Sequence, residues 1–188
     1  MPHPVRRVVT GLNENGRARV LIDSPSPHVM DSGASAVTEI WSNSESPATY
    51  DNDGDRAIFP VQHDPNPNGT LCRVLELAPG LAIPEGVPVE QLLELAKGLF
   101  KGLQSDFEPT LESVARHPSF HKTNSLDYLC ILSGRLTMLL DDDDEVTLEP
   151  GDVVVQQGVM HGWRVDGDEP LRMFAVLIDG VPALENQS

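Results

Sequence analysis

The sequence is poor in basic residues and has no long apolar run. Thirteen lysines and arginines stand against 29 aspartates and glutamates, which gives a formal net charge of −16 over 188 residues. A nucleic-acid backbone or an anionic lipid surface would repel that charge, so we expect neither as a partner. No stretch approaches the roughly 20 apolar residues of a membrane helix, and residues 1–10 lack the apolar segment of a secretory signal. We therefore expect a cytoplasmic protein.

Cysteine is scarce as well, and helix breakers are common. The two cysteines, Cys72 and Cys130, each lie inside an apolar run, so no disulfide framework is indicated. Sixteen prolines and 15 glycines interrupt any long regular element, which argues against a helical bundle. With 39% hydrophobic residues, the chain can build the core of one domain.

The N-terminal part, residues 1–80, has the pattern of short strands separated by polar segments. Val5–Thr10 and Ala18–Ile22 flank a turn sequence and predict a hairpin. Val37–Trp41 is a further strand candidate, and Thr70–Ala78 alternates well enough to predict another. Ser42–Asn68 is rich in Ser, Asp, Asn and Pro, which predicts a loop. We expect this part to contribute strands to a barrel.

One helix is predicted over residues 88–105. Leucines, Ala96 and Phe100 recur there at helical spacing, and Pro88 suits the first turn. Such an apolar stripe could form a lid or a partner surface, but packing against the outside of a sheet is the commoner arrangement. Both interpretations stay open at this point.

Residues 106–182 are dense in short strands. The five carboxylates of Asp141–Glu145 lack the ligand spacing of a calcium loop and predict a solvated hairpin tip. Short strands at intervals of about 8–12 residues indicate a sandwich or barrel. The predicted fold is therefore mainly β: an antiparallel barrel or jelly roll with an N-terminal strand arm and one external helix, in a single domain. Its strands are expected at 126–132, 135–140, 146–148, 153–156, 162–165 and 171–178.

The six histidines fall into two groups. His3, His28 and His63 lie among polar residues, and we assign them to surface loops. The other three follow the strand pattern of the C-terminal part: in an extended strand, residues two apart share a face. Such a strand would present one face with His117, Ser119, His121, Thr123 and, without a bulge, Asp127, and a later strand would present His161 with Trp163.

If the two strands are neighbours, His121, Asp127 and His161 converge inside the barrel. Two imidazoles and a carboxylate suit a divalent metal such as iron, manganese, nickel or zinc and leave positions open for a substrate or dioxygen. The alternative is that these are ordinary buried histidines with backbone partners. Residue types alone do not separate the two.

Two motifs flank these residues. The segment from His121 to Gly134, in which six residues separate Asp127 from the glycine, resembles the first motif of the cupin superfamily. The segment from Gly151 to His161 resembles the second, which pairs a Gly-Asp turn with Gly-x-x-His. The resemblance covers about a third of the chain. It differs from the family pattern at Thr123, which stands in place of a histidine, and at Asp127, which stands in place of a glutamate; the second motif is one residue short and lacks its proline.

The resemblance implies an antiparallel barrel with a pocket for a small molecule. His121, His161 and Asp127 would be metal ligands, and His117 is a candidate replacement for the histidine missing at Thr123. The implied pocket residues are Thr123, Tyr128, Met160, Trp163 and Gln157.

The leading hypothesis from this resemblance is a metal-dependent lyase or isomerase. It would act on a small oxygenated compound, phenolic or polyketide-like, by decarboxylation, dehydration or enolisation, with Asp127 or His117 as general base. An iron dioxygenase of the same fold and a non-catalytic binding protein are the alternatives. Cupins of this size commonly pair, and open sheet edges need covering, so we also expect a homodimer.

Overall fold

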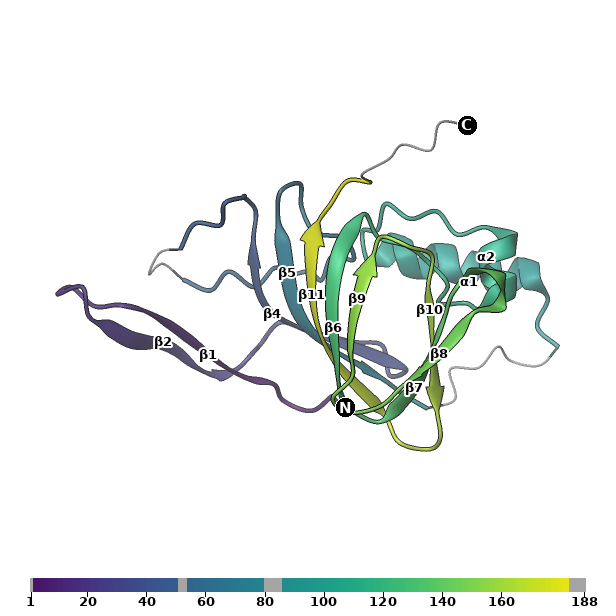
Figure 1. Cartoon of the computed structure of the whole chain (residues 1–188), viewed down its shortest axis with the longest axis horizontal. Helices are drawn as coiled ribbons and strands as arrows, with labels where there is room; N and C mark the ends of the chain where they lie inside the picture. Colours follow the sequence, from purple (N-terminus) through teal and green to yellow (C-terminus); the bar gives the residue numbers. More distant parts are fainter. Residues whose placement is uncertain (1, 51–53, 80–85, 183–188) are drawn as a thin grey trace.

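The computed structural model describes residues 2–50, 54–79 and 86–182 and contains antiparallel sheets (Figure 1). A six-stranded sheet has the order β3-β4-β5-β11-β6-β9, and a three-stranded sheet has the order β10-β7-β8. Together they form a barrel of jelly-roll type, and a separate β1-β2 hairpin projects from it. The strands are β1 (Arg6–Leu12), β2 (Ala18–Pro25), β3 (Val29–Asp31), β4 (Ser35–Asn43), β5 (Thr70–Leu77), β6 (Ser125–Ser133), β7 (Arg135–Leu139), β8 (Glu145–Leu148), β9 (Val153–Gln157), β10 (Gly162–Asp166) and β11 (Leu171–Asp179).

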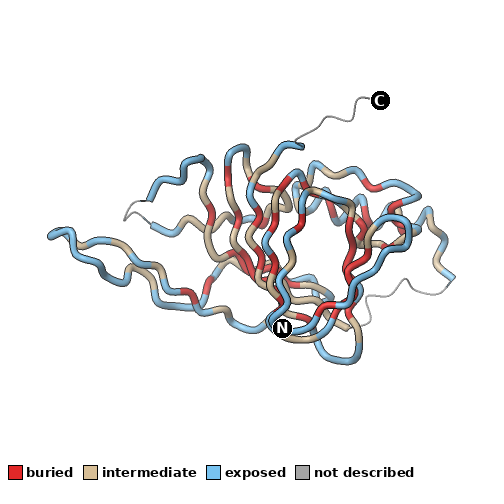
Figure 2. The backbone as a smooth tube through the Cα atoms, in the orientation of Figure 1, coloured by how far each residue is buried: buried red, intermediate tan, exposed pale blue. Residues whose placement is uncertain are grey.

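The core lies between the two sheets, where Figure 2 shows the buried residues facing one another. Strand alternation explains which residues enter it. In β6, Leu129 and Ile131 face inward, and Met173 and Ala175 do the same in the neighbouring β11. Trp163 of β10 closes the core from the other sheet. Burying each large apolar side chain contributes roughly 1.5–3 kcal/mol, so this interior drives the closure of the two sheets.

Two helices pack together at one end of the barrel (Figure 1). Helix α1 (Val89–Gly102) lies within the range where the sequence predicts a helix, with Pro88 at its N-cap. The short α2 (Leu111–Arg116) was not predicted; a capping box between Thr110 and Ser113 starts it. The apolar stripe of α1 packs against α2, and its C-terminal turn also reaches the barrel cavity. A role of this helix as a lid or a partner surface stays a prediction.

Several predicted elements are confirmed, and their bounds change by a few residues. The hairpin, the loop after β4 and the strand at Thr70 are present. The acidic run contains the short 3-10 helix η1 (Asp141–Asp143), whose residues are exposed, as expected for a hairpin tip. Strand β3 was not predicted. Among the described residues, no helix is long and apolar enough to cross a membrane. The division into 1–80, 88–105 and 106–182 stays a prediction.

Candidate functional site

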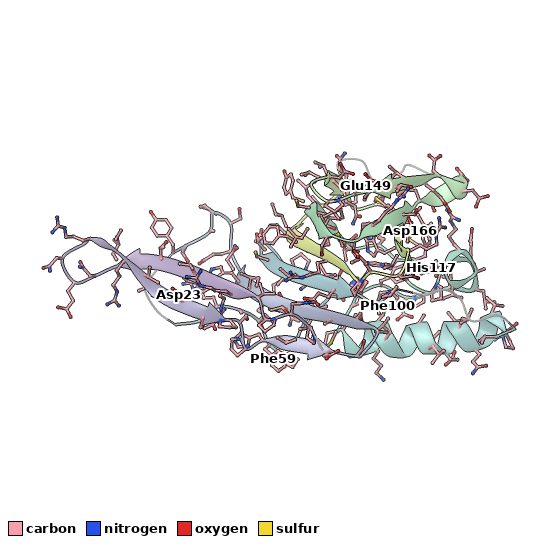
Figure 3. The ribbon with its side chains drawn as sticks, turned by 90° about the horizontal axis from the view of Figure 1, so that it is seen from below. Asp23, Phe59, Phe100, His117, Glu149 and Asp166 are labelled. Atoms are coloured by element: carbon pink, nitrogen blue, oxygen red, sulfur yellow. The ribbon has the colours of Figure 1, made fainter. Side chains whose placement is uncertain are left out.

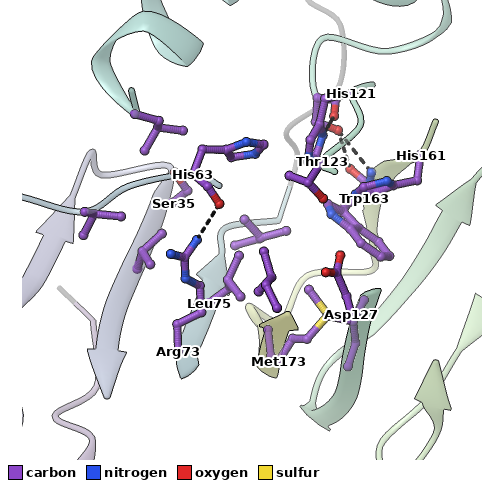
Figure 4. A pocket seen from close by; sticks show the side chains of 18 of the residues that line it. Ser35, His63, Arg73, Leu75, His121, Thr123, Asp127, His161, Trp163 and Met173 are labelled. Carbon is purple, nitrogen blue, oxygen red and sulfur yellow. Dashed lines mark hydrogen bonds between the residues drawn. The ribbon is translucent and has the colours of Figure 1, made fainter. Parts of the chain in front are cut away.

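A cavity opens between the sheets beneath the C-terminal end of α1. It encloses about 930 Å³ of space, including its open mouth. Apolar side chains from β4, β5, β11 and α1 line it, together with a smaller number of polar side chains. Figure 4 shows His63 and Arg73 on one side of this cavity and His121, His161 and Asp127 on the other. A concave apolar space with a few polar groups is the usual form of a small-molecule site.

His121 and His161 face each other across a short antiparallel bridge. The backbone N–H of each donates to the carbonyl of the other at 2.8 Å, and the two ring centroids are 4.3 Å apart. The Nδ1 of His121 lies 2.6 Å from the carbonyl oxygen of Ser119, and that of His161 lies 2.9 Å from the carbonyl oxygen of Val159. A carbonyl can only accept, so each Nδ1 carries the hydrogen and each Nε2 carries a lone pair.

Both imidazoles are neutral near pH 7. Burial lowers the pKa of His161 to about 4, and burial together with the neighbouring His161 lowers the pKa of His121 well below its ordinary value. A neutral ring whose Nε2 carries a lone pair can accept a proton from a ligand or bind a cation.

Asp127 is linked to His161 through Gln156. Asp127 in β6 is opposite Gln156 in β9, and both are 3% exposed. The Gln156 Nε2 donates to Asp127 Oδ2 at 2.8 Å and lies 3.3 Å from the Nε2 of His161. Within the described part of the chain, Asp127 Oδ1 and Gln156 Oε1 are buried without a hydrogen-bond partner. Burial raises the pKa of Asp127, so its carboxylate is a stronger base than an exposed one.

Thr123 lines the cavity at the position where the family pattern has a second histidine. It is 3% exposed, and its hydroxyl accepts a hydrogen bond from Ser125 at 2.7 Å. Trp163 also lines the cavity, 5.0 Å from the ring of His161 between centroids, as its shared face with His161 predicts. These two placements agree with the sequence.

His63 is a cavity residue that the sequence assigned to a surface loop. The loop after β4 folds back, and its backbone N–H at His63 donates to the carbonyl of Leu103 at 2.8 Å. The His63 ring lies 4.7 Å from that of His121 and makes an edge contact with Phe100. Its Nδ1 is 2.9 Å from Ser105 Oγ and 3.3 Å from Asp64 Oδ2. Because the sequence neighbours of His63 are polar, they predicted a surface loop and not a place in the cavity.

A buried ion pair holds the loop that carries His63. The Nη2 atom of Arg73 in β5 lies 2.7 Å from Oε1 of Glu39 in β4. The side chain of Arg73 is 5% exposed, and that of Glu39 is 0% exposed. Arg73 also donates to the carbonyls of Gln62 at 2.6 Å and His63 at 3.3 Å. Burial raises the pKa of Glu39 to about 6, against the opposing effect of Arg73. In the sequence, Arg73 stands among the apolar residues of one strand face. Because a buried charge requires polar partners, Arg73 was the one indication that a polar segment covers this strand.

Three predicted pocket residues lie elsewhere. Tyr128 is 44% exposed because its neighbours Asp127 and Leu129 take the inner positions of β6. Gln157 is exposed for the same reason: Gln156 takes the inner position of β9. Met160 lies in a separate hollow beside α2.

His117 does not line the cavity either. It ends α2 instead of starting a strand, so the face predicted for it does not exist. Its ring is buried, and its Nδ1 lies 2.7 Å from the hydroxyl of Ser119, which in turn accepts from the backbone N–H of Trp163 at 3.1 Å. His117 therefore supports the wall of the cavity from behind. Of the other histidines, His3 is exposed as expected, and His28 contacts Asp55 at 3.1 Å.

The ligand atoms that His121, His161 and Asp127 offer fit a divalent cation in part. The two Nε2 lone pairs and the unpartnered Asp127 Oδ1 are the donor types that such ions prefer. Among the described residues, however, no three His, Cys, Asp or Glu side chains lie close enough together to hold a metal ion. The amide of Gln156 lies between Asp127 and His161. The chemistry of the two imidazoles thus fits a metal, whereas Asp127 is not in place as a third ligand.

Comparison with known proteins places this site in a family. Residues 107–177 match the model of the cupin domain. The cupin-domain-containing oxidoreductase virC of Hypocrea virens is 24% identical over 96% of this chain and 78% of its own length. The homologous oxidoreductase fogC of Aspergillus ruber is 38% identical over 39% of this chain. The phomopsin biosynthesis cluster protein C' of Diaporthe leptostromiformis is 32% identical over 50% of it.

The chain spans 36% of the length of fogC and 41% of the phomopsin protein. Among solved structures, the Cnp3 cupin domain of Schizosaccharomyces pombe matches with a TM-score of 0.45 and 13% identity over 94% of this chain and 89% of that one. Residues 107–177, which include His121, Asp127 and His161, match the cupin domain.

Proposed function

We propose that this protein is a metal-dependent enzyme of the lyase or isomerase type that acts on a small oxygenated compound in secondary metabolism. The observation that carries the proposal is the buried pair His121 and His161, whose Nδ1 hydrogens are bound to backbone carbonyls so that each Nε2 carries a lone pair. The Nε2 of His161 lies 3.3 Å from the amide nitrogen of Gln156, which a ligand would have to displace. The name of the phomopsin cluster protein supports the metabolic setting.

In this proposal His121 and His161 hold the metal, and a divalent ion bound there would supply Lewis-acid polarisation of a substrate oxygen. Asp127 takes a proton from the carbon beside the substrate's carbonyl group, and the electrons of that C–H bond move toward the oxygen to give an enolate. Gln156 holds Asp127 Oδ2, which leaves Oδ1 as the proton acceptor. Return of the proton to a different atom completes an isomerisation.

The cavity favours a substrate with an apolar body and one oxygen-bearing end. Leu75, Leu77 and Met173 are among its apolar side chains, and the imidazoles and Asp127 are among its polar ones. Phenolic and polyketide-like compounds have this division of character. Trp163 and Phe100 would orient a flat ring and exclude water. We propose Thr123 as a hydroxyl partner for the substrate.

An oxidoreductase is the second candidate, favoured by the printed names of fogC and virC. In that case His121 and His161 would hold an iron ion, which would supply the chemistry of dioxygen activation. A homodimer and a cytoplasmic location remain predictions from the sequence, as does a catalytic contribution of His117.

The test is metal content, followed by proton exchange. Protein purified without chelator is offered iron, manganese, nickel and zinc, and bound metal is measured by elemental analysis. His121→Ala and His161→Ala should each weaken binding at least about 100-fold, because metal sites worth roughly 10 kcal/mol share that energy among few ligands. His3→Ala is the matched control, because His3 is exposed and does not line the cavity.

The loaded protein is then incubated in D2O with phenolic ketones and 3-keto acids. Deuterium incorporation beside the carbonyl, lost in Asp127→Asn with metal retained, supports the lyase or isomerase type. Oxygen consumption without that exchange supports the oxidoreductase instead. Wild-type protein that takes up none of the four metals contradicts both, and tight binding of the probes without any turnover would then favour a non-catalytic binding protein.

A further inference from the structure

The side-chain amide of Gln156 has an orientation that its neighbours fix. Its Nε2 atom donates to Asp127 Oδ2 at 2.8 Å and lies 3.3 Å from Nε2 of His161, which carries a lone pair because Nδ1 of that ring is bound to a carbonyl. Both neighbours are acceptors, and an amide NH2 group has two hydrogens to donate. Turning the amide over would place Oε1 against these two acceptors. The oxygen therefore stays on the opposite side of the amide.

The oxygen of this amide is a buried acceptor without a donor. Gln156 is 3% exposed and lines the cavity, and within the described residues its Oε1 has no hydrogen-bond partner. The same holds for Oδ1 of Asp127 beside it. Leaving a buried acceptor unpaired costs free energy. Two such atoms in the wall of one cavity indicate a ligand that brings a hydrogen-bond donor to them.

Thr123 adds a group of the opposite kind to the cavity. Its hydroxyl oxygen accepts the hydrogen of Ser125 at 2.7 Å, so its own hydrogen remains for another acceptor. Thr123 is 3% exposed and lines the cavity. Thr123 stands where the family pattern has a histidine, and Gln156 lies in the motif that lacks its proline. These departures from the family pattern thus place one donor and one acceptor in the cavity wall.

The positions of Asp127 and Gln156 restrict where the donor group of the ligand lies. The two residues are directly opposite each other on β6 and β9, so their Cβ atoms are about 5 Å apart. The acceptor Oε1 is therefore a close neighbour of the carboxylate that takes a proton from carbon in the proposed function. Two neighbouring contacts of this kind suit a carbon atom that carries both the hydrogen to be removed and a hydroxyl group.

We propose that Gln156 is a specificity-determining residue and that the substrate is an α-hydroxyketone, with a hydroxyl group on the carbon beside its carbonyl group. This rests on the proposed function, in which Asp127 removes a proton from that carbon. The hydroxyl group donates to Gln156 Oε1, and the carbonyl oxygen accepts from Thr123. The apolar body lies against the cavity residues Trp163 and Phe100; Figure 3 shows Phe100 on the side of α1 that faces the sheets.

Three ketones with the same phenyl body test this assignment: α-hydroxyacetophenone, α-methoxyacetophenone and acetophenone. Their Kd values are measured by titration calorimetry on the purified protein. The hydroxy compound should bind at least about 10-fold more tightly than the other two, because it alone brings a donor to the buried oxygen. In Gln156→Met that preference should fall to within about twofold, since the acceptor is gone.

Two further variants separate the roles of the polar groups. Gln157→Met is the matched control, because Gln157 is the exposed neighbour on the same strand, and it should keep the full preference. Thr123→Val should weaken the binding of all three ketones alike, because each has a carbonyl group. If circular dichroism shows that Gln156→Met is unfolded, Gln156→Asn takes its place, since it withdraws the oxygen by one bond and should also reduce the preference.

The titrations are repeated after treatment with a chelator, because a bound metal that held both oxygens of the hydroxyketone would give a preference of its own. A preference that disappears with the chelator, or one that survives in the Gln156 variant, would overturn the proposal. Equal binding of the three ketones to the wild type, or no binding of any at millimolar concentration, would do the same. Metal uptake and deuterium exchange without the preference would leave the proposed function standing, and the preference without metal uptake would contradict only that function.

Discussion

The buried ion pair of Glu39 and Arg73 offers the strongest test of how the cavity is held together. Replacing Arg73 by methionine keeps an unbranched side chain and removes the guanidinium. Glu39, which is 0% exposed, then loses its counter-ion, and the carbonyls of Gln62 and His63 lose their donor. Breaking a buried pair by removing one partner costs about 3–5 kcal/mol. We expect Arg73→Met to lower the free energy of unfolding by that amount.

The second arm of the test is Glu39→Gln, which leaves Arg73 with its two carbonyl partners. Its cost at pH 7.5 should be well below that of Arg73→Met, because the raised pKa of Glu39 means that the fold tolerates a neutral group at this position. Glu39→Leu combined with Arg73→Met removes both charges, so the double variant should cost at least about 1 kcal/mol less than the sum of its two single substitutions. Urea unfolding followed by tryptophan fluorescence and circular dichroism gives all of these values.

The Glu39–Arg73 pair also predicts the direction in which the free energy of unfolding changes with pH. The folded pKa of Glu39 is about 6, above the ordinary 4.5. Its protonation therefore favours the folded state: this contribution is fully present below pH 4.5 and is lost as the pH rises through 6, with a size of roughly 2 kcal/mol. The stability of the wild type relative to Glu39→Gln should fall by about that much between pH 4.5 and 7.5. The cost of Arg73→Met should shrink on acidification, because Glu39 is then neutral. If Arg73→Met costs under about 1 kcal/mol at pH 7.5, the pair does not hold the loop.

Two further predictions concern the frame around the cavity. Gly134→Ala should destabilise the fold by about 2–4 kcal/mol, because the φ angle of Gly134 is +78° and a Cβ there would lie 2.7 Å from the Pro170 carbonyl oxygen. Gly167→Ala is the control: Gly167 has a φ angle of +82° but open space around it, so this substitution should cost only about 1–2 kcal/mol in the same urea titration. Asp55→Asn should cost about 2 kcal/mol at pH 7, because its hydrogen bonds with Arg7 are lost and they hold the pKa of Asp55 well below its ordinary value. This cost should shrink as the pH falls below the ordinary pKa of an aspartate, and a cost at pH 2 as large as that at pH 7 would contradict the assignment.

The convergence of His121, Asp127 and His161 on one cavity could be predicted because it follows from strand periodicity. Residues two apart share a face, and the two motifs fix the spacing of the turns between strands. The bridge between His121 and His161 is the pairing that the sequence expected if their two segments were neighbours. Roles as metal ligands remain proposals, because periodicity places side chains and does not place an ion.

The errors at Tyr128 and Gln157 have the same physical origin. Period two makes the inward and outward positions differ by a single residue, so one wrong choice moves a side chain from the cavity to the solvent. In β9 both candidates were glutamines, and nothing in their chemistry separates them; Gln156 is inward because it is opposite Asp127. His117 lies outside the cavity for another reason, since α2 ends there and a turn follows in place of the expected strand.

The position of His63 cannot be predicted from strand periodicity. It lies in a loop, so no repeat predicts its direction, and its position depends on contacts with residues far along the chain. Arg73 holds the loop backbone through two carbonyls, and Glu39 makes that buried charge tolerable. A buried arginine inside an alternating strand requires partners, so the charge itself predicts that a polar segment crosses the inner face of the sheet. The identity of that segment follows only from the fold, because any polar loop of sufficient length satisfies the requirement equally well.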